Sequence, residues 1–315
     1  LSKNADNDAA IAAAGGIEVF MSLARDGNER QKEYAAGALA NISVNADNQG
    51  AIAAAGGIEV LVSLARDGNE GQKEFAAGAL CNLATNDDNE AVIVAAGGIE
   101  VFMSLARDGN EMQKGHAAAV LANLADNDDN SAAIAAAGGI EVLVSLARDG
   151  NQGQKENAAW ALWNLSVNDD NKVAIAAAGG IEVLVSLARD GNEGQKEFAA
   201  GALCNLATNH DNEAAIVAAG GIEVFMSLAR DGNEMQKGRA AAVLANLAAN
   251  NNLKVAIAAA GGIEVLISLA RDGNEAQKEN AVRALWNLSM NDDNKAAIVA
   301  AGGIEVLIAL ARDGN

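Results

Sequence analysis

Asparagine is the residue type in this chain that is best placed to bind another molecule, because it recurs at intervals of 41 residues. The seven positions are Asn41, Asn82, Asn123, Asn164, Asn205, Asn246 and Asn287. A primary amide carries two N–H donors and one carbonyl acceptor, and this set complements the N–H and C=O of a peptide group. Asparagine is also a mediocre helix former, since its short amide competes with the backbone for hydrogen bonds. A position that always holds asparagine therefore indicates either ligand binding or the anchoring of a neighbouring loop.

Histidine and cysteine do not indicate a catalytic or metal site, because the two histidines are too far apart to share a metal, and His210, six residues after Cys204, fits a loop residue better than a catalytic base. The two histidines are His116 and His210, and the two cysteines are Cys81 and Cys204, which lie three 41-residue intervals apart. If each interval adds a layer of packed helices about 8–10 Å thick, the cysteines lie far beyond the Cα separation of about 7 Å that a disulfide spans. We therefore expect free thiols, no bound metal, no cofactor and no enzymatic activity.

The asparagines belong to a repeat whose clearest marker is the pentapeptide Gly-Gly-Ile-Glu-Val. Its eight copies begin at Gly15, Gly56, Gly97, Gly138, Gly179, Gly220, Gly261 and Gly302, with no insertion or deletion between them. A strict period of about 20–50 residues is typical of a solenoid, in which each unit buries its apolar face against its neighbours. We predict one continuous array over residues 1–315, made of seven complete repeats and a truncated eighth, about residues 288–315.

Each repeat is expected to form three helices, as residues 87–126 illustrate. Residues 87–89 are N-cap candidates for a short helix over about 90–96, and the double glycine then forces a turn. A second helix over 99–107 places apolar side chains at helical spacing, and a third and longer helix covers about 111–126. The asparagines fall on the third helices.

The repeats resemble those of the armadillo family, as found in importin-α and β-catenin. The resemblance rests on stretches such as Ala-Ile-Val-Ala-Ala-Gly-Gly-Ile-Glu-Val-Phe-Met-Ser-Leu and Ala-Ala-Trp-Ala-Leu-Trp-Asn-Leu-Ser, which recur in register over the whole chain. It implies an all-α, right-handed α-solenoid of three-helix repeats. One departure is consistent, because glutamate replaces the family's usual proline near the start of the second helix and the chain contains no proline.

The resemblance also implies that the seven asparagines line a concave groove and hold the backbone of an extended peptide. Residues seven and four positions before each asparagine share its face of the helix. The flanking residues that we expect to contact the peptide are Tyr34, Phe75, His116, Asn157, Trp160, Phe198, Arg239 and Arg283. Uniform asparagines beside variable neighbours favour a groove that binds backbone everywhere and side chains locally. The alternative is that these positions are exposed and that their residue types have varied without a role in binding.

Tryptophan and arginine on this face bear on the choice of peptide. The family's peptide binders typically carry a tryptophan four residues before the asparagine, where it forms a slot for a long basic side chain. Only Trp160 matches that pattern, and Arg239 and Arg283 add positive charge, so a run of adjacent lysine slots is not favoured. Trp163 and Trp286 directly precede an asparagine, and either groove contact or packing between repeats fits them.

The chain has a formal net charge of −20, which narrows the classes of partner. A nucleic-acid binder needs a basic stripe, and anionic membranes repel an acidic surface, so neither partner is expected. Basic peptide or protein segments are favoured instead. Free thiols and the lack of a signal peptide or apolar span in this sequence indicate a cytoplasmic or nuclear location.

The sequence is also compatible with two functions other than peptide binding. The array is either a self-assembling structural element or an engineered protein with no dedicated natural ligand. Self-association is expected to run end to end, because Ile304, Leu307, Ile308 and Leu310 have no third helix of their own repeat to cover them.

Overall fold

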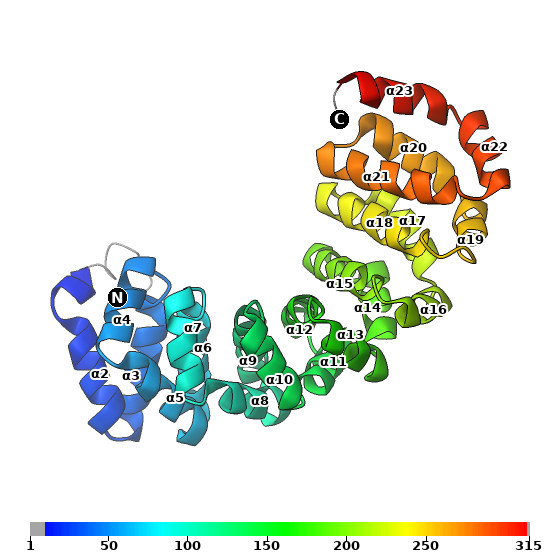
Figure 1. Cartoon of the computed structure of the whole chain (residues 1–315). Coiled ribbons are helices and arrows are strands. Elements are labelled where there is room, and N and C mark those ends of the chain that lie inside the picture. Colours follow the sequence, from blue (N-terminus) through cyan, green and yellow to red (C-terminus); the bar gives the residue numbers. More distant parts are fainter. Residues whose placement is uncertain (1–9, 314–315) are drawn as a thin grey trace. The chain divides into compact units, whose positions relative to one another are not determined.

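The computed structural model describes residues 10–313, which contain α-helices and no strand (Figure 1). Helices of three lengths alternate along the chain in the predicted order. The short first helices are α4 (Ala46–Ala54), α7 (Asp87–Ala95), α10 (Asp128–Ala136), α13 (Asp169–Ala177), α16 (His210–Ala218), α19 (Lys254–Ala259) and α22 (Asp292–Ala300). The second helices are α2 (Gly16–Asp26), α5 (Gly57–Asp67), α8 (Gly98–Asp108), α11 (Gly139–Asp149), α14 (Gly180–Asp190), α17 (Gly221–Asp231), α20 (Gly262–Asp272) and α23 (Gly303–Asp313). The third helices are α3 (Glu29–Ile42), α6 (Glu70–Leu83), α9 (Glu111–Leu124), α12 (Gln152–Leu165), α15 (Glu193–Leu206), α18 (Glu234–Leu247) and α21 (Glu275–Leu288).

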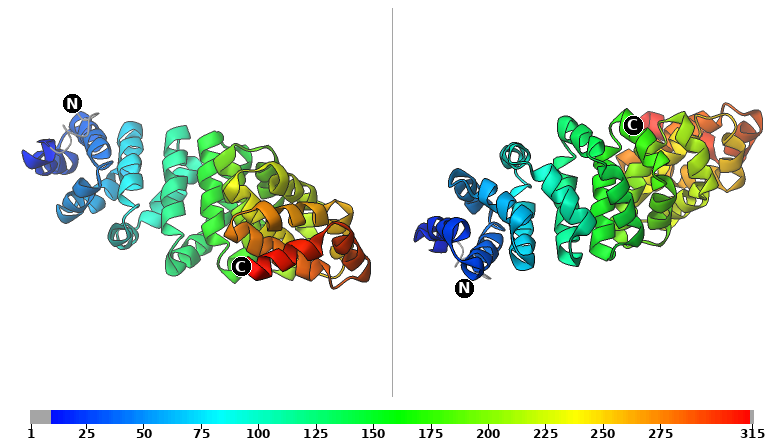
Figure 2. Two further views of the ribbon diagram at one scale, coloured as in Figure 1. Left: turned by 90° about the horizontal axis from the view of Figure 1, so that it is seen from above. Right: turned by 90° about the horizontal axis from the view of Figure 1, so that it is seen from below.

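The described helices form two compact units, which meet in sequence between Leu165 and Ser166. In unit 1 the third helices α3, α6, α9 and α12 pack in series, and the second helix of each repeat packs on the third (Figure 1). Unit 2 repeats this arrangement with α15, α18 and α21 (Figure 2). Each repeat therefore buries its apolar residues against its neighbours, as a solenoid requires.

Both glycines of the double-glycine turn are required by the backbone. Gly97 has a φ of 79°, a left-handed conformation that suits glycine. A Cβ on Gly98 would lie 2.5 Å from Cγ2 and 2.7 Å from the carbonyl oxygen of Ile93, so no side chain fits there. The turn bends the chain by 83° between α7 and α8. The first glycine thus supplies the conformation, and the second permits the close approach of the two helices.

The structure corrects the expected caps of the short helices. Asn86 is the N-cap of α7, because its side chain accepts hydrogen bonds from the backbone N–H groups of Asp88 and Asn89. The helix therefore begins at Asp87, earlier than predicted. The aspartates lie in the first turn, where their negative charges interact favourably with the positive end of the helix dipole.

A buried glutamine links each third helix to the one before it within a unit. Gln113 completes a capping box with Asn110 at the start of α9, and its Nε2 donates to the carbonyl oxygen of Glu70 at 3.0 Å. Gln72, Gln154, Gln236 and Gln277 make the same bond to the residue 43 positions earlier. This recurring bond fixes the spacing of the third helices, which carry the asparagines.

Candidate functional site

The stripe of asparagines lies on the third helices of both units. Asn82, Asn123 and Asn164 are half-buried on α6, α9 and α12, and Asn41 on α3 is exposed. In unit 2 the half-buried members are Asn205, Asn246 and Asn287, on α15, α18 and α21. Because the third helices pack in series within a unit, each unit presents its asparagines on successive helices.

Most of these amides bond to the preceding third helix. Asn82 Nδ2 donates to the carbonyl oxygen of Ala40 at 3.1 Å and to Ser43 Oγ at 3.1 Å. The same bond to the carbonyl 42 residues earlier is made by Asn164 to Ala122, Asn246 to Cys204 and Asn287 to Ala245. Asn205 donates to Ser166 Oγ, whereas Asn123 donates to Ala119 within its own helix. Most of these amides therefore anchor the preceding repeat, either at a carbonyl of its third helix or at the serine in the turn that follows that helix.

In Asn164 and Asn287, this anchoring does not use up the hydrogen-bonding capacity of the amide. Nδ2 of Asn164 and Nδ2 of Asn287 each donate to one carbonyl oxygen, at 2.9 Å. A primary amide has a second N–H and a carbonyl oxygen beyond that bond. A single side chain of this kind can support the fold and pair with the backbone of a ligand.

In unit 1, aromatic residues seven positions before an asparagine lie over small residues of the preceding repeat. A Cβ on Gly37 would lie 3.6 Å from the ring of Phe75, and one on Gly78 would lie 3.4 Å from Nε2 of His116. Burial lowers the pKa of His116, while the nearby carboxylate of Glu74 opposes that shift, so the imidazole is neutral at pH 7. The glycines thus make room for rings that face the stripe.

The other flanking residues of unit 1 have different surroundings. Tyr34 is 61% exposed, and its hydroxyl accepts a hydrogen bond from Arg30 Nε at 3.2 Å. Asn157 donates from Nδ2 to the carbonyl oxygen of Gly115 at 3.1 Å, so this residue also anchors a neighbouring helix. Trp160 is half-buried on α12. Unit 1 therefore offers aromatic and neutral polar side chains beside its asparagines.

In unit 2, the flanking residues place positive charge on the stripe. Phe198 and Arg239 are half-buried, whereas Arg283 is exposed and donates from Nη2 to Asn246 Oδ1 at 3.3 Å. The sequence fits Trp286 either to groove contact or to packing between repeats; its side chain is 62% exposed, so it is not packed between repeats. Its exposure could not be read from the sequence, because Trp163 occupies the equivalent position and is half-buried.

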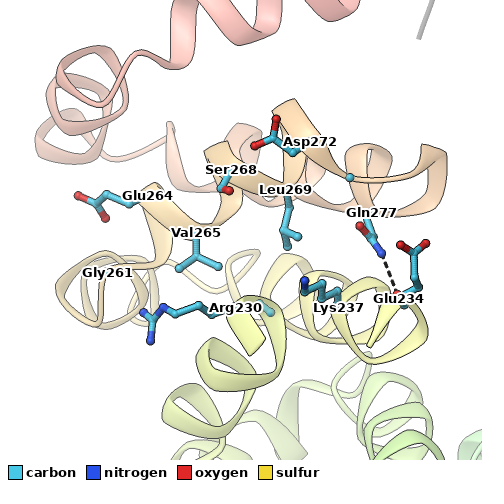
Figure 3. A pocket seen from close by; sticks show the side chains of 12 residues that line it. Arg230, Glu234, Lys237, Gly261, Glu264, Val265, Ser268, Leu269, Asp272 and Gln277 are labelled. Carbon is cyan, nitrogen blue, oxygen red and sulfur yellow. Dashed lines mark hydrogen bonds between the residues drawn. The ribbon is translucent and has the colours of Figure 1, made fainter. Parts of the chain in front are cut away.

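A separate cavity of about 580 Å³ lies between the second helices α17 and α20. Figure 3 shows Arg230 and Lys237 on one side of it, with Glu264 and Asp272 on the other. An equivalent cavity of about 430 Å³ occurs in unit 1 between α8 and α11. Neither cavity includes an asparagine of the stripe, and both have linings of mixed charge.

Within residues 10–313, no cluster of three or more histidine, cysteine, aspartate or glutamate side chains could hold a metal ion. Cys81 and Cys204 are free thiols, as the spacing predicted. No single helix in that range is long and apolar enough to cross a membrane. Five pairs of consecutive helices reach the necessary length and composition together, but each pair is bent by 77–84°.

Comparison with known proteins identifies the repeats. The profile of the armadillo/β-catenin-like repeat matches residues 4–44, 45–85, 127–167, 168–208 and 250–290. The chain belongs to the armadillo repeat family. No curated protein matches this armadillo chain.

Solved structures similar to this armadillo chain include engineered proteins. One engineered protein is 38% identical with a TM-score of 0.90, and the match covers 98% of this chain and 77% of the other. A designed armadillo repeat protein in complex with the peptide (KR)4 is 25% identical with a TM-score of 0.67, covering 73% of this chain and 99% of the other. These matches confirm the all-α solenoid of repeats.

Proposed function

We propose that this chain is a non-catalytic scaffold that binds an extended peptide or protein segment along the asparagine stripe. The observation that carries the proposal is the recurrence of an amide on successive third helices, together with the second N–H and the carbonyl oxygen that Asn164 and Asn287 keep beyond the bond that anchors each of them. Peptide groups of an extended segment present a donor and an acceptor at regular intervals, and an amide pairs with both. The similar designed armadillo protein that binds (KR)4 supports this function.

The flanking residues are proposed to select side chains of the bound segment. In unit 1, Tyr34, Phe75, His116 and Trp160 supply aromatic surfaces, and Asn157 supplies an amide. Aromatic faces attract cationic side chains and pack against their aliphatic stems. The net charge of −20 favours basic segments in general. We further propose that the repeats form a single array.

A displayed library of random dodecapeptides tests this function. The wild-type chain is expected to enrich related sequences, and the variant with Asn123, Asn164 and Asn205 all changed to alanine is expected to bind them more weakly. Each hydrogen bond lost to the peptide should cost about 0.5–1.5 kcal/mol of binding free energy. Because the asparagines also support the fold, Gln113→Ala is the control, since Gln113 links third helices without belonging to the stripe. Equal loss of binding in the control would refute a direct contact.

A second candidate is an engineered array with no dedicated natural ligand. The observations that favour it are the strict 41-residue period and the 38% identity to an engineered protein. Under this alternative the library yields no enriched sequence, even though the chain is folded. A self-assembling array would instead sediment faster as the protein concentration rises, whereas a monomeric array would not.

A further inference from the structure

Four residues on the third helices of unit 2 form a cluster: Cys204 on α15, Arg239 and Asn246 on α18, and Arg283 on α21. Asn246 Nδ2 donates to the carbonyl oxygen of Cys204 at 3.1 Å and lies 3.9 Å from its Sγ. Asn246 Oδ1 accepts from Arg283 Nη2 at 3.3 Å. The asparagine therefore holds the guanidinium group of Arg283 beside the stripe.

Both guanidinium groups of this cluster lower the pKa of the Cys204 thiol. Burial raises the pKa of the thiol, and Arg283 and then Arg239 oppose that shift by stabilising the thiolate. Burial lowers the pKa of Arg239, and the carboxylate of Glu197 opposes that change. The guanidinium of Arg239 remains charged at neutral pH, because the pKa of arginine lies far above 7. The cluster thus has two positive groups and one facing carboxylate.

Unit 1 has residues without positive charge at the equivalent positions, and its Asn123 donates to Ala119 and not to the carbonyl oxygen of a cysteine. The residues 123 positions earlier are Cys81, His116, Asn123 and Trp160. Burial raises the pKa of Cys81 with no opposing cation, and burial lowers the pKa of His116, so its imidazole is neutral at pH 7. The two units therefore differ in charge at one equivalent place on the stripe.

We propose that Arg239 and Arg283 form an anion-binding subsite on the asparagine stripe of unit 2, which receives a carboxylate or phosphate group on a side chain of the bound segment. The planar guanidinium group suits both anions, because its N–H groups match two oxygens at once. The identification of the anion with a peptide side chain rests on the proposed function. The preference for an anion is confined to this subsite, since the flanking residues of unit 1 are neutral or aromatic and the whole chain is acidic.

The two cysteines allow the subsite to be tested without a peptide. The full-length chain is treated with two methanethiosulfonate reagents of similar size, one bearing a sulfonate and the other a trimethylammonium group. Mass spectrometry of tryptic peptides then gives the rate at each thiol. The ratio of the sulfonate rate to the ammonium rate cancels the thiolate fraction of each cysteine. At low salt, we expect this ratio to be about tenfold higher at Cys204 than at Cys81, because two nearby cations attract one reagent and repel the other.

The matched variant carries Arg239→His and Arg283→Trp, which place the unit 1 residues in unit 2. The ratio at Cys204 should fall to that at Cys81, while the ratio at Cys81 should not change. Equal ratios in the wild-type chain would overturn the subsite. Failure of the sulfonate to reach Cys204 would also overturn it, because a site closed to that reagent is closed to an acidic side chain.

Two competitors then identify the source of the anion. An octapeptide of alternating aspartate and serine should protect Cys204 from a neutral methanethiosulfonate at lower concentration than inorganic phosphate does. An octapeptide with asparagine in place of aspartate should need at least a threefold higher concentration to give the same protection of Cys204. Equal protection by phosphate and by the acidic peptide would overturn the assignment to a peptide side chain. Because the reagent ratio requires no peptide, the charge of the subsite is tested separately from the proposed function.

Discussion

Asn164 on α12 donates from Nδ2 to the carbonyl oxygen of Ala122 on α9 at 2.9 Å, which joins two third helices within unit 1. Ala122 is the residue just before Asn123, so the stripe is linked from one repeat to the next. A residue that forms such a bond cannot be assigned to ligand binding alone. Stability and affinity must be measured on the same variants.

We predict that Asn164→Ala destabilises the fold as well as the proposed complex. The variant loses one hydrogen bond and leaves the Ala122 carbonyl without that donor, which should lower the free energy of unfolding by about 0.5–1.5 kcal/mol. Urea unfolding followed by circular dichroism measures the change. An unchanged free energy of unfolding would show that the bond contributes no net stability.

Gln113→Ala should destabilise the chain more than Gln31→Ala. Both glutamines complete a capping box, with Asn110 and Asn28 respectively. Gln113 is also buried and donates to the carbonyl oxygen of Glu70, whereas Gln31 is exposed. Because it also loses the buried bond, Gln113→Ala should lower the free energy of unfolding by about 1–2 kcal/mol more than Gln31→Ala does. Urea unfolding measures both changes. Equal losses would mean that the capping box alone matters.

Glu90 is predicted to make stability fall as the pH rises. Partial burial, with the charges of Asp87 and Asp126, raises its pKa from 4.5 to about 7. The folded state therefore holds the proton more tightly than the unfolded state. Stability is unaffected by this group well below pH 4.5 and falls between about pH 4.5 and 7. The loss should be no more than about 1 kcal/mol, because Glu90 is only half-buried and solvent screens its charge.

Glu90→Gln is the matched variant for this prediction, because Gln49 occupies the equivalent position and donates to the carbonyl oxygens of Ser43 and Asn82. The variant should unfold at the same urea concentration as the wild type near pH 4 and at a higher one at pH 8. A constant difference across this range would contradict the raised pKa of Glu90.

Self-association is predicted at high protein concentration through the exposed face of α23. Leu307 and Ile308 are 36% and 47% exposed, whereas Leu266 and Ile267 at the same positions of α20 are 0% and 3% exposed beneath α21. Leu310 was expected on this face but is buried, since α23 packs on α20. Salt should promote association, because it screens the repulsion between chains of charge −20.

Leu307→Glu should weaken this association, and Glu305→Gln serves as the control on the same helix. Light scattering at moderate salt and increasing concentration is the measurement. A wild-type chain that stays monomeric throughout would rule the association out.

The sequence alone determined the period, the three helices of each repeat and the sharp turn between the first two. These features depend on residues close together in the chain, such as Gly97 with its left-handed backbone and Asn110 with its capping box. The family resemblance rests on the same local patterns. The one local error concerned the short helices, where Asn86 caps α7 in place of the aspartates that follow it.

Only the tertiary structure decided what the recurring polar side chains contact. Gln113 bonds to a carbonyl 43 residues earlier, and Asn164 bonds to one 42 residues earlier. The periodicity marks both residues, but their partners depend on how one third helix packs against the next. The same packing leaves Trp286 exposed while Trp163, at the equivalent position, is half-buried. Equivalent positions in different repeats of a solenoid thus have different surroundings, because each side chain also contacts residues of the adjacent repeats.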